Sequence, residues 1–209
     1  MIRLVDAVAD PAAARAAALD EFRSGGLVVL PTETVYGLAV LPSEPSAVDA
    51  MFRRKGRSEN RPVAVLVADV DQARTLVEPG PAFELLAAAF WPGPLTVVTT
   101  RGVGFSARLG GDQATVGVRC PDHELVRALA AEVGPLAVTS AHRSGHPTEA
   151  HARSVAEALG GDLLVLEGGP CSGAAATVVD VTTDPARVLR AGSIGREALT
   201  GIGLVLNDD

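Results

Sequence analysis

Residues 27–38 read Leu-Val-Val-Leu-Pro-Thr-Glu-Thr-Val-Tyr-Gly-Leu. The apolar run at 27–30 predicts a short buried strand, and Pro31 ends it. Hydroxyl groups and a carboxylate follow directly after the proline. By itself this segment is more typical of an ordinary capped turn, so any functional meaning depends on the rest of the chain.

Strands and helices alternate on both sides of this segment. Apolar runs predict further strands at 63–67, 95–100, 115–119, 136–140, 163–166, 177–181 and 187–189. Helical patterns lie between them at 10–24, 46–55, 71–77, 81–90, 122–133 and 152–159, and Asp122 is expected to cap the fifth of these. The alternation predicts an α/β fold with a twisted mixed β-sheet and flanking helices, and no linker divides residues 1–209, which are expected to form a single domain.

The amino-acid composition and net charge argue against several classes of protein. Hydrophobic residues make up 47% of the 209 residues, which predicts a folded chain with a sizeable core. A formal net charge of −7 argues against duplex nucleic acid as the main ligand, although a local basic patch remains possible. The chain has two isolated cysteines and neither a signal peptide nor a long apolar run, which predicts a cytoplasmic protein with no membrane contact.

A basic loop is the second candidate segment. Residues 55–62 read Lys-Gly-Arg-Ser-Glu-Asn-Arg-Pro and hold three cations next to glycine and proline. Such a segment cannot form a regular helix face, so its charges can converge, and lysine and arginine both suit phosphate. A solvated surface loop is the alternative interpretation.

Two further segments place polar residues at strand ends. Residues 137–147 read Ala-Val-Thr-Ser-Ala-His-Arg-Ser-Gly-His-Pro, so a buried strand delivers Thr139 and Ser140 at its carboxyl end. Ligands of open α/β sheets bind at this end. The other segment, 176–180, reads Ala-Thr-Val-Val-Asp and precedes a strand that carries Arg190.

Three histidines lie close together at His142, His146 and His151, which raises the question of a metal site. Gly145 and Pro147 interrupt any helix that would align the three rings, and no cysteine is nearby. An exposed loop is therefore expected here, and no metal-binding residues are predicted.

Six motifs now stand in a recognisable order. They are Pro-Thr-Glu-Thr-Val-Tyr-Gly-Leu, Lys-x-Arg followed by a basic residue and proline, Trp-Pro-Gly-Pro-Leu-Thr, Val-Arg-x-Pro-x-His, Thr-Ser-Ala-x-x-Ser-Gly-x-Pro and Thr-Val-Val-Asp. From about residue 10 to about residue 195, the chain resembles the YrdC-like threonylcarbamoyl-AMP synthase family. It is most similar to the short, single-domain form, because nothing follows residue 209 that would supply the extra domain of longer members.

The resemblance implies an activity. Members combine L-threonine, bicarbonate and ATP to make threonylcarbamoyl-AMP and pyrophosphate, and a downstream tRNA threonylcarbamoyl transferase complex uses the product. The implied fold is YrdC/RibB-like, with a central ligand cavity lined by positive charge. Mg²⁺ is expected on the polyphosphate, held mostly by phosphate and water.

The resemblance also assigns residues. Lys55, Arg57 and Ser140 would be catalytic. The ATP-binding set would be Lys55, Arg57, Arg61, Thr115, Ser140, His142, Thr148 and Arg190. The threonine-binding set would be Thr32, Tyr36, Arg119, Thr139 and Thr177.

One position departs from the family pattern, and two alternative functions follow. The family usually reads Thr-Ser-Ala-Asn where this chain has His142, and histidine can donate to phosphate but cannot copy an amide. One alternative is a paralogue of the same fold that acts as an RNA-binding or ribosome-associated module without synthase activity. The other is an enzyme that makes a carbamoyl-adenylate from carbamoyl phosphate.

Overall fold

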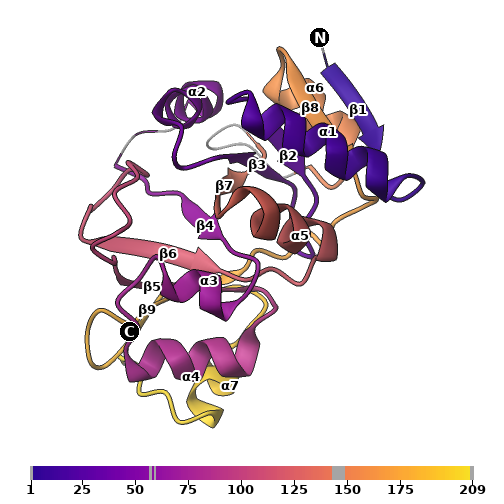
Figure 1. The fold of residues 1–209 in the computed structure, drawn as a ribbon. Coiled ribbons are helices and arrows are strands. Elements are labelled where there is room, and N and C mark those ends of the chain that lie inside the picture. Colours follow the sequence, from indigo (N-terminus) through magenta and orange to yellow (C-terminus); the bar gives the residue numbers. More distant parts are fainter. Residues whose placement is uncertain (1, 57, 59, 143–148, 208–209) are drawn as a thin grey trace.

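A single mixed sheet of ten strands organises the protein, seen in a computed structural model that describes residues 2–56, 58, 60–142 and 149–207 (Figure 1). Two of the predicted site residues, Arg57 and Thr148, lie outside the described residues. In spatial order the strands are β1 (Ile2–Asp6), β8 (Leu163–Glu167), β2 (Val28–Leu30), β3 (Gly37–Val40), β7 (Leu136–Ser140), β4 (Ala64–Leu66), β6 (Thr115–Arg119), β5 (Leu95–Thr100), β9 (Thr177–Asp180) and β10 (Arg187–Arg190).

Parallel and antiparallel pairs mix throughout this sheet. The parallel pairs are β1 with β8, β8 with β2, β4 with β6, and β5 with β9. The remaining neighbours pair antiparallel. The predicted twisted mixed sheet with flanking helices is therefore confirmed.

Helices cover both faces of the sheet. They are α1 (Pro11–Arg23), α2 (Pro45–Lys55), α3 (Val70–Arg74), α4 (Pro81–Phe90), α5 (Glu124–Val133), α6 (Ala152–Leu159) and α7 (Arg196–Gly201). Helices α1 and α5 lie side by side and bury Phe22 and Leu129 in one apolar cluster (Figure 1). Helices α2, α4 and α6 bury Met51, Phe83 and Val155 in the second, so each face has its own core.

The N-terminal ends of α1 and α5 test the two capping residues that the sequence predicts. Helix α1 begins as expected, because the Asp10 side chain accepts a hydrogen bond from the backbone nitrogen of Ala13 at 2.9 Å. The expectation that Asp122 caps the fifth helix is wrong. Helix α5 begins at Glu124 with His123 at the N-cap position, and the backbone nitrogen of Asp122 instead donates to Glu33.

Strand pairing brings distant motifs together. Strand β3 lies between β2 and β7, so Gly37 pairs with Ser140. Strand β4 follows β7 in the sheet, and its Leu66 pairs with Arg119 of β6. The turn at 31–36, the end of β7 and the end of β6 thus meet near the middle of the sheet.

Next to β9, the backbone at Gly192 packs closely against the backbone of residues 175–177. A Cβ atom added at Gly192 would lie 2.3 Å from the backbone oxygen of Ala175 and 2.5 Å from the backbone nitrogen of Thr177. Only glycine fits without moving the backbone at either residue. The two residues Ala175 and Ala176 that Gly192 approaches both line the cavity described below.

We therefore expect Gly192→Ala to lower the free energy of unfolding by about 1–3 kcal/mol, measured by urea denaturation. Gly104→Ala is the matched control, because a Cβ atom at Gly104 meets nothing within 4 Å. Equal stability of the two variants would contradict the close approach.

Among the described residues, no helix has the length and apolar character needed to cross a membrane.

Candidate active site

A cavity of about 630 Å³ opens on the middle of the sheet. It lies where β3, β4, β7 and β6 adjoin, and residues from β5, β9 and β10 close it. The predicted residues on its wall are Thr32, Thr115, Arg119, Thr139, Ser140, His142 and Arg190. Thr32 and Arg190 are 158 positions apart in the sequence, yet both line this cavity.

The turn after β2 is organised by one hydroxyl group. Thr32 Oγ1 donates to the backbone oxygen of Val35 at 2.7 Å and accepts from the backbone nitrogens of Thr34 and Val35 at 3.2 and 3.1 Å. It also lies 2.9 Å from Thr34 Oγ1. Threonine side chains commonly stabilise turns in this way, so Thr32 shapes the wall as well as lining it.

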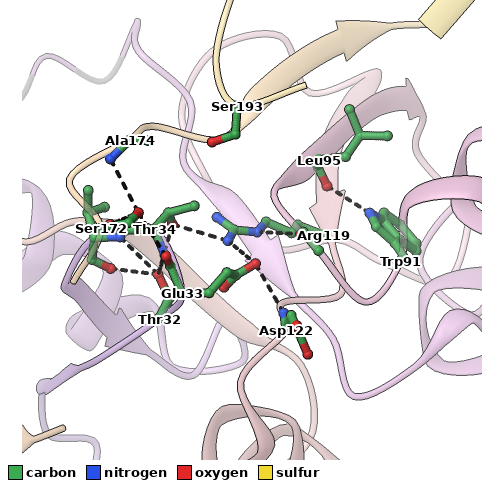
Figure 2. Close-up of polar contacts among 12 residues, drawn as sticks. Thr32, Glu33, Thr34, Trp91, Leu95, Arg119, Asp122, Ser172, Ala174 and Ser193 are labelled. Carbon is green, nitrogen blue, oxygen red and sulfur yellow. Dashed lines mark hydrogen bonds and ion pairs between the residues drawn. The ribbon is translucent and has the colours of Figure 1, made fainter. Parts of the chain in front are cut away.

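Arg119 is anchored on several sides (Figure 2). Its Nε donates to the backbone oxygen of Gly93 at 3.1 Å, and its Nη2 donates to Thr34 Oγ1 at 3.1 Å. The same Nη2 lies 2.7 Å from Glu33 Oε1 in an ion pair. The residue is only 7% exposed, so these contacts fix a buried guanidinium at the cavity wall.

Arg190 brings a second guanidinium to the same cavity. Its Nε donates to the backbone oxygen of Ala176 at 2.9 Å. Burial lowers the pKa of Arg190, and the positive charge of Arg119 lowers it further. Arginine remains protonated despite such a shift, so two mutually repelling cations face one cavity and favour an anion there.

Lys55 reaches the cavity wall through Ser140. It is the last residue of α2 and is 2% exposed. Its Nζ donates to the backbone oxygen of Ser140 and lies 3.4 Å from Ser140 Oγ, which in turn lies 3.5 Å from His142 Nε2. The amine therefore contacts Ser140, which lines the cavity, whereas Lys55 is not itself among the described cavity-lining residues.

Tyr36 and Thr177 were both predicted to bind the substrate L-threonine, but their hydroxyl groups bind the protein backbone. Tyr36 is fully buried, and its hydroxyl donates to the oxygen of Gly169 at 2.7 Å and accepts from the nitrogen of Gly168 at 3.1 Å. Thr177 Oγ1 donates to the oxygen of Ile194 at 2.8 Å and accepts from its nitrogen at 3.0 Å. Neither residue is among the described cavity-lining residues, and their assignment to threonine stays a prediction.

The basic loop is only partly described. Arg61 is exposed, and its neighbours Asn60 and Pro62 line the cavity. The assignment of Arg61 to ATP stays a prediction, as do those of Arg57 and Thr148, which the structure does not describe.

Sequence reasoning missed a polar cluster on β9 and β10. Asp180 Oδ1 accepts from the nitrogen and the hydroxyl of Thr182 at 2.9 and 2.6 Å, and Oδ2 pairs with Arg187 at 3.0 Å. Burial by itself would raise the pKa of Asp180, but the bonds from Thr182 and Arg187 outweigh it and lower that pKa. All three residues line the cavity. The only sequence signal was the end of the Thr-Val-Val-Asp motif.

The Tyr36 hydroxyl offers a test of its structural role. We expect Tyr36→Phe to lower the free energy of unfolding by about 1 kcal/mol, because the partly buried backbone groups of Gly168 and Gly169 lose their hydrogen-bond partner. Urea denaturation measures this difference. A variant as stable as the parent chain, with weaker threonine binding, would instead support the threonine contact that the resemblance implies.

Comparisons with known proteins agree with this architecture. The Sua5/YciO/YrdC family model, described as “Telomere recombination”, matches residues 20–192. A Mycobacterium tuberculosis protein is 39% identical over 189 residues, which cover 88% of this chain and 87% of the relative. The Bacillus subtilis protein named threonylcarbamoyl-AMP synthase is 37% identical over 198 residues, which cover 92% of this chain and 57% of the relative.

Solved structures extend the match to nearly the whole chain. Pyrococcus abyssi Sua5 complexed with L-threonine superposes with a TM-score of 0.87 at 33% identity. That alignment covers 99% of this chain and 62% of the other, so the chain spans less than two thirds of that relative. Escherichia coli YciO, at 22% identity and a TM-score of 0.80, has the same fold. From the motifs, the sheet and these matches together, the chain belongs to the Sua5/YciO/YrdC family.

Proposed function

We propose that this chain is an L-threonylcarbamoyladenylate synthase, in which residues 1–209 act as a single domain. The observation that carries the proposal is the convergence of Arg119, Arg190 and the Lys55–Ser140 contact on one cavity. Its volume of about 630 Å³ is typical of small-molecule sites. The names of the relatives, and the L-threonine in the Pyrococcus abyssi structure, further support it.

The reaction needs no covalent nucleophile on the protein. Bicarbonate loses hydroxide to give carbon dioxide, whose carbon is attacked by the amine of threonine. The nitrogen gives up a proton to that hydroxide, so a carbamate and water are formed. A carbamate oxygen then attacks the α-phosphorus of ATP, and the bond to the departing pyrophosphate breaks. The protein contributes by positioning the reactants and by stabilising the charge that develops on the phosphates.

Two groups of residues at the cavity suit the two kinds of anion. The forked guanidinium of Arg119 suits the carboxylate of threonine, and Thr32 and Thr139 line the same cavity. Lys55, Ser140 and His142 form a connected group of donors that suits phosphate oxygens. Arg190 lines the same cavity and is close enough to Arg119 for their charges to repel, so it suits a carboxylate, carbamate or phosphate bound there.

The cavity fits Mg²⁺ only as a companion of ATP. Among the described residues, no three histidine, cysteine or acidic side chains are grouped to hold a metal ion. Both oxygens of Asp180 are already bonded to Thr182 and Arg187. Mg²⁺ bound through phosphates and water is consistent with this donor set, and it would neutralise charge on the polyphosphate.

The proposal also includes partners and location. The product, a mixed anhydride, has to be consumed by a group-transfer enzyme, and we propose the tRNA threonylcarbamoyl transferase complex in the cytoplasm. Any binding of RNA by this chain itself is expected to be weak, because its net charge is −7. The comparisons give no support to the alternative of an RNA-binding module without synthase activity.

An assay of pyrophosphate release tests the proposal. With ATP, bicarbonate and Mg²⁺ present, release should require L-threonine. Release that requires carbamoyl phosphate would favour the carbamoyl-adenylate enzyme. No release, together with RNA retained by the protein on a filter, would favour the RNA-binding module.

A further inference from the structure

Glu33 supports Arg119 from outside the cavity. Its Oε1 pairs with Arg119 Nη2 at 2.7 Å and accepts from the backbone nitrogen of Asp122 at 3.1 Å. Figure 2 shows the carboxylate between these two partners. Glu33 is not among the described residues that line the cavity, whereas its neighbours Thr32 and Thr34 are. The carboxylate therefore acts on the cavity through Arg119.

The other carboxylate oxygen of Glu33 has an unusual environment. Oε2 is buried and has no hydrogen-bond partner in the described part of the chain, and the same is true of His123 Nδ1. These are the only two buried side-chain atoms without partners among the described residues. A buried polar atom left unpaired is unfavourable, so both atoms would gain from a partner.

The negative charge of Glu33 influences the pKa of His123. Burial lowers the pKa of His123, and the largest opposing effect is the negative charge of Glu33. Asp122 also acts to raise that pKa, and Arg127 acts to lower it. A neutral imidazole with its proton on Nδ1 can still donate a hydrogen bond to a carboxylate.

We propose that Glu33 and His123 are a positioning pair for Arg119, in which His123 Nδ1–H donates to Glu33 Oε2 when a substrate carboxylate binds Arg119. The inference rests on the proposed function and specifies how its threonine end works. An arriving carboxylate places a second negative charge near Glu33, and like charges repel. The bond from His123 stabilises the charge on Glu33, so Glu33 keeps its hold on Arg119 while the remaining donors of Arg119 bind substrate.

Glu33→Gln tests the first half of the pair. Loss of the ion pair should raise KM for L-threonine by about 10-fold or more, while KM for ATP changes by less than about 3-fold. Glu124→Gln is the control, because Glu124 is an exposed carboxylate next to His123 on the chain and should leave both constants unchanged. An unchanged threonine KM in a folded Glu33→Gln variant would overturn the inference.

A pair of His123 variants tests the second half without altering the carboxylate. Asparagine places an amide nitrogen close to the position of Nδ1, whereas leucine has a similar size and no donor. We expect His123→Leu to raise the threonine KM by about 3- to 10-fold and His123→Asn to restore most of it. Equal threonine KM in the two variants, at equal unfolding midpoints, would overturn the inference.

These outcomes separate the inference from the proposed function. The unaltered chain is measured first, and absence of threonine-dependent turnover contradicts the proposed function and with it the pair. Threonine-dependent turnover with no effect of the Glu33 and His123 variants contradicts the positioning pair alone.

Discussion

Lys55→Met should lower kcat/KM for threonine-dependent pyrophosphate release by about 10²–10³-fold. Methionine keeps the length of the side chain and removes the charge. The lysine amine is nearly fully buried and contacts Ser140, so no neighbouring surface charge can take its place. Preorganised charges of this kind act most strongly on the transition state, where charge on the phosphates increases.

The control for this variant is Arg53→Met. Arg53 lies two residues earlier on α2 and is exposed. It should show the rate of the unaltered chain, which separates the loss of one specific cation from the loss of net charge. A Lys55→Met variant with a near-normal rate and normal unfolding would contradict the phosphate role of Lys55.

Arg119→Lys should raise KM for L-threonine by about 10²-fold, equivalent to roughly 2–3 kcal/mol. Lysine keeps the positive charge but cannot contact Gly93, Thr34 and Glu33 in the arrangement of the forked guanidinium. The substrate carboxylate would then meet a cation that is no longer held in place. The measurement is a threonine titration at saturating ATP.

Arg119→Lys is preferable to a neutral replacement at this position. Removing the charge would leave the partly buried carboxylate of Glu33 without its ionic partner, which is destabilising and risks unfolding. KM for ATP serves as the internal control and should change by less than about 3-fold. Equal increases in the KM values of both substrates would indicate a general distortion of the cavity and contradict the assignment of Arg119 to the carboxylate.

Much of the fold was predictable because local patterns were strong. The apolar runs at 95–100, 115–119 and 136–140 coincide with β5, β6 and β7, and the Ala-rich segment after Asp10 is α1. No local pattern predicted β1, β3 or α7. Strand β1 contains only half-buried and exposed residues, and its partner β8 lies more than 150 residues away, so no local signal marks their pairing.

Strand β3 shows a different limit of sequence reasoning. It spans only Gly37–Val40 and follows directly on a polar turn, so its four buried residues resembled the end of that turn. It nevertheless joins β2 to β7 and thereby brings Gly37 beside Ser140. The order of strands in the sheet, which no single segment specifies, creates the cavity.

The same limit applies to the site. The motifs marked Thr32, Arg119, Thr139 and Ser140 as residues that could meet, and all four line one cavity in the structure. Motif membership does not determine the direction of a side chain. Tyr36 belongs to the same motif as Thr32, yet its hydroxyl binds the backbone of Gly168 and Gly169.

The most direct test of the account follows the carbon of bicarbonate. The chain is incubated with ATP, Mg²⁺, L-threonine and ¹³C-labelled bicarbonate, and the adenylate product is analysed by mass spectrometry. We predict a threonylcarbamoyl-AMP that carries one ¹³C atom and is absent when L-threonine is omitted. No labelled adenylate under these conditions, from a folded chain, would contradict the claim that this cavity joins an amino acid, bicarbonate and ATP.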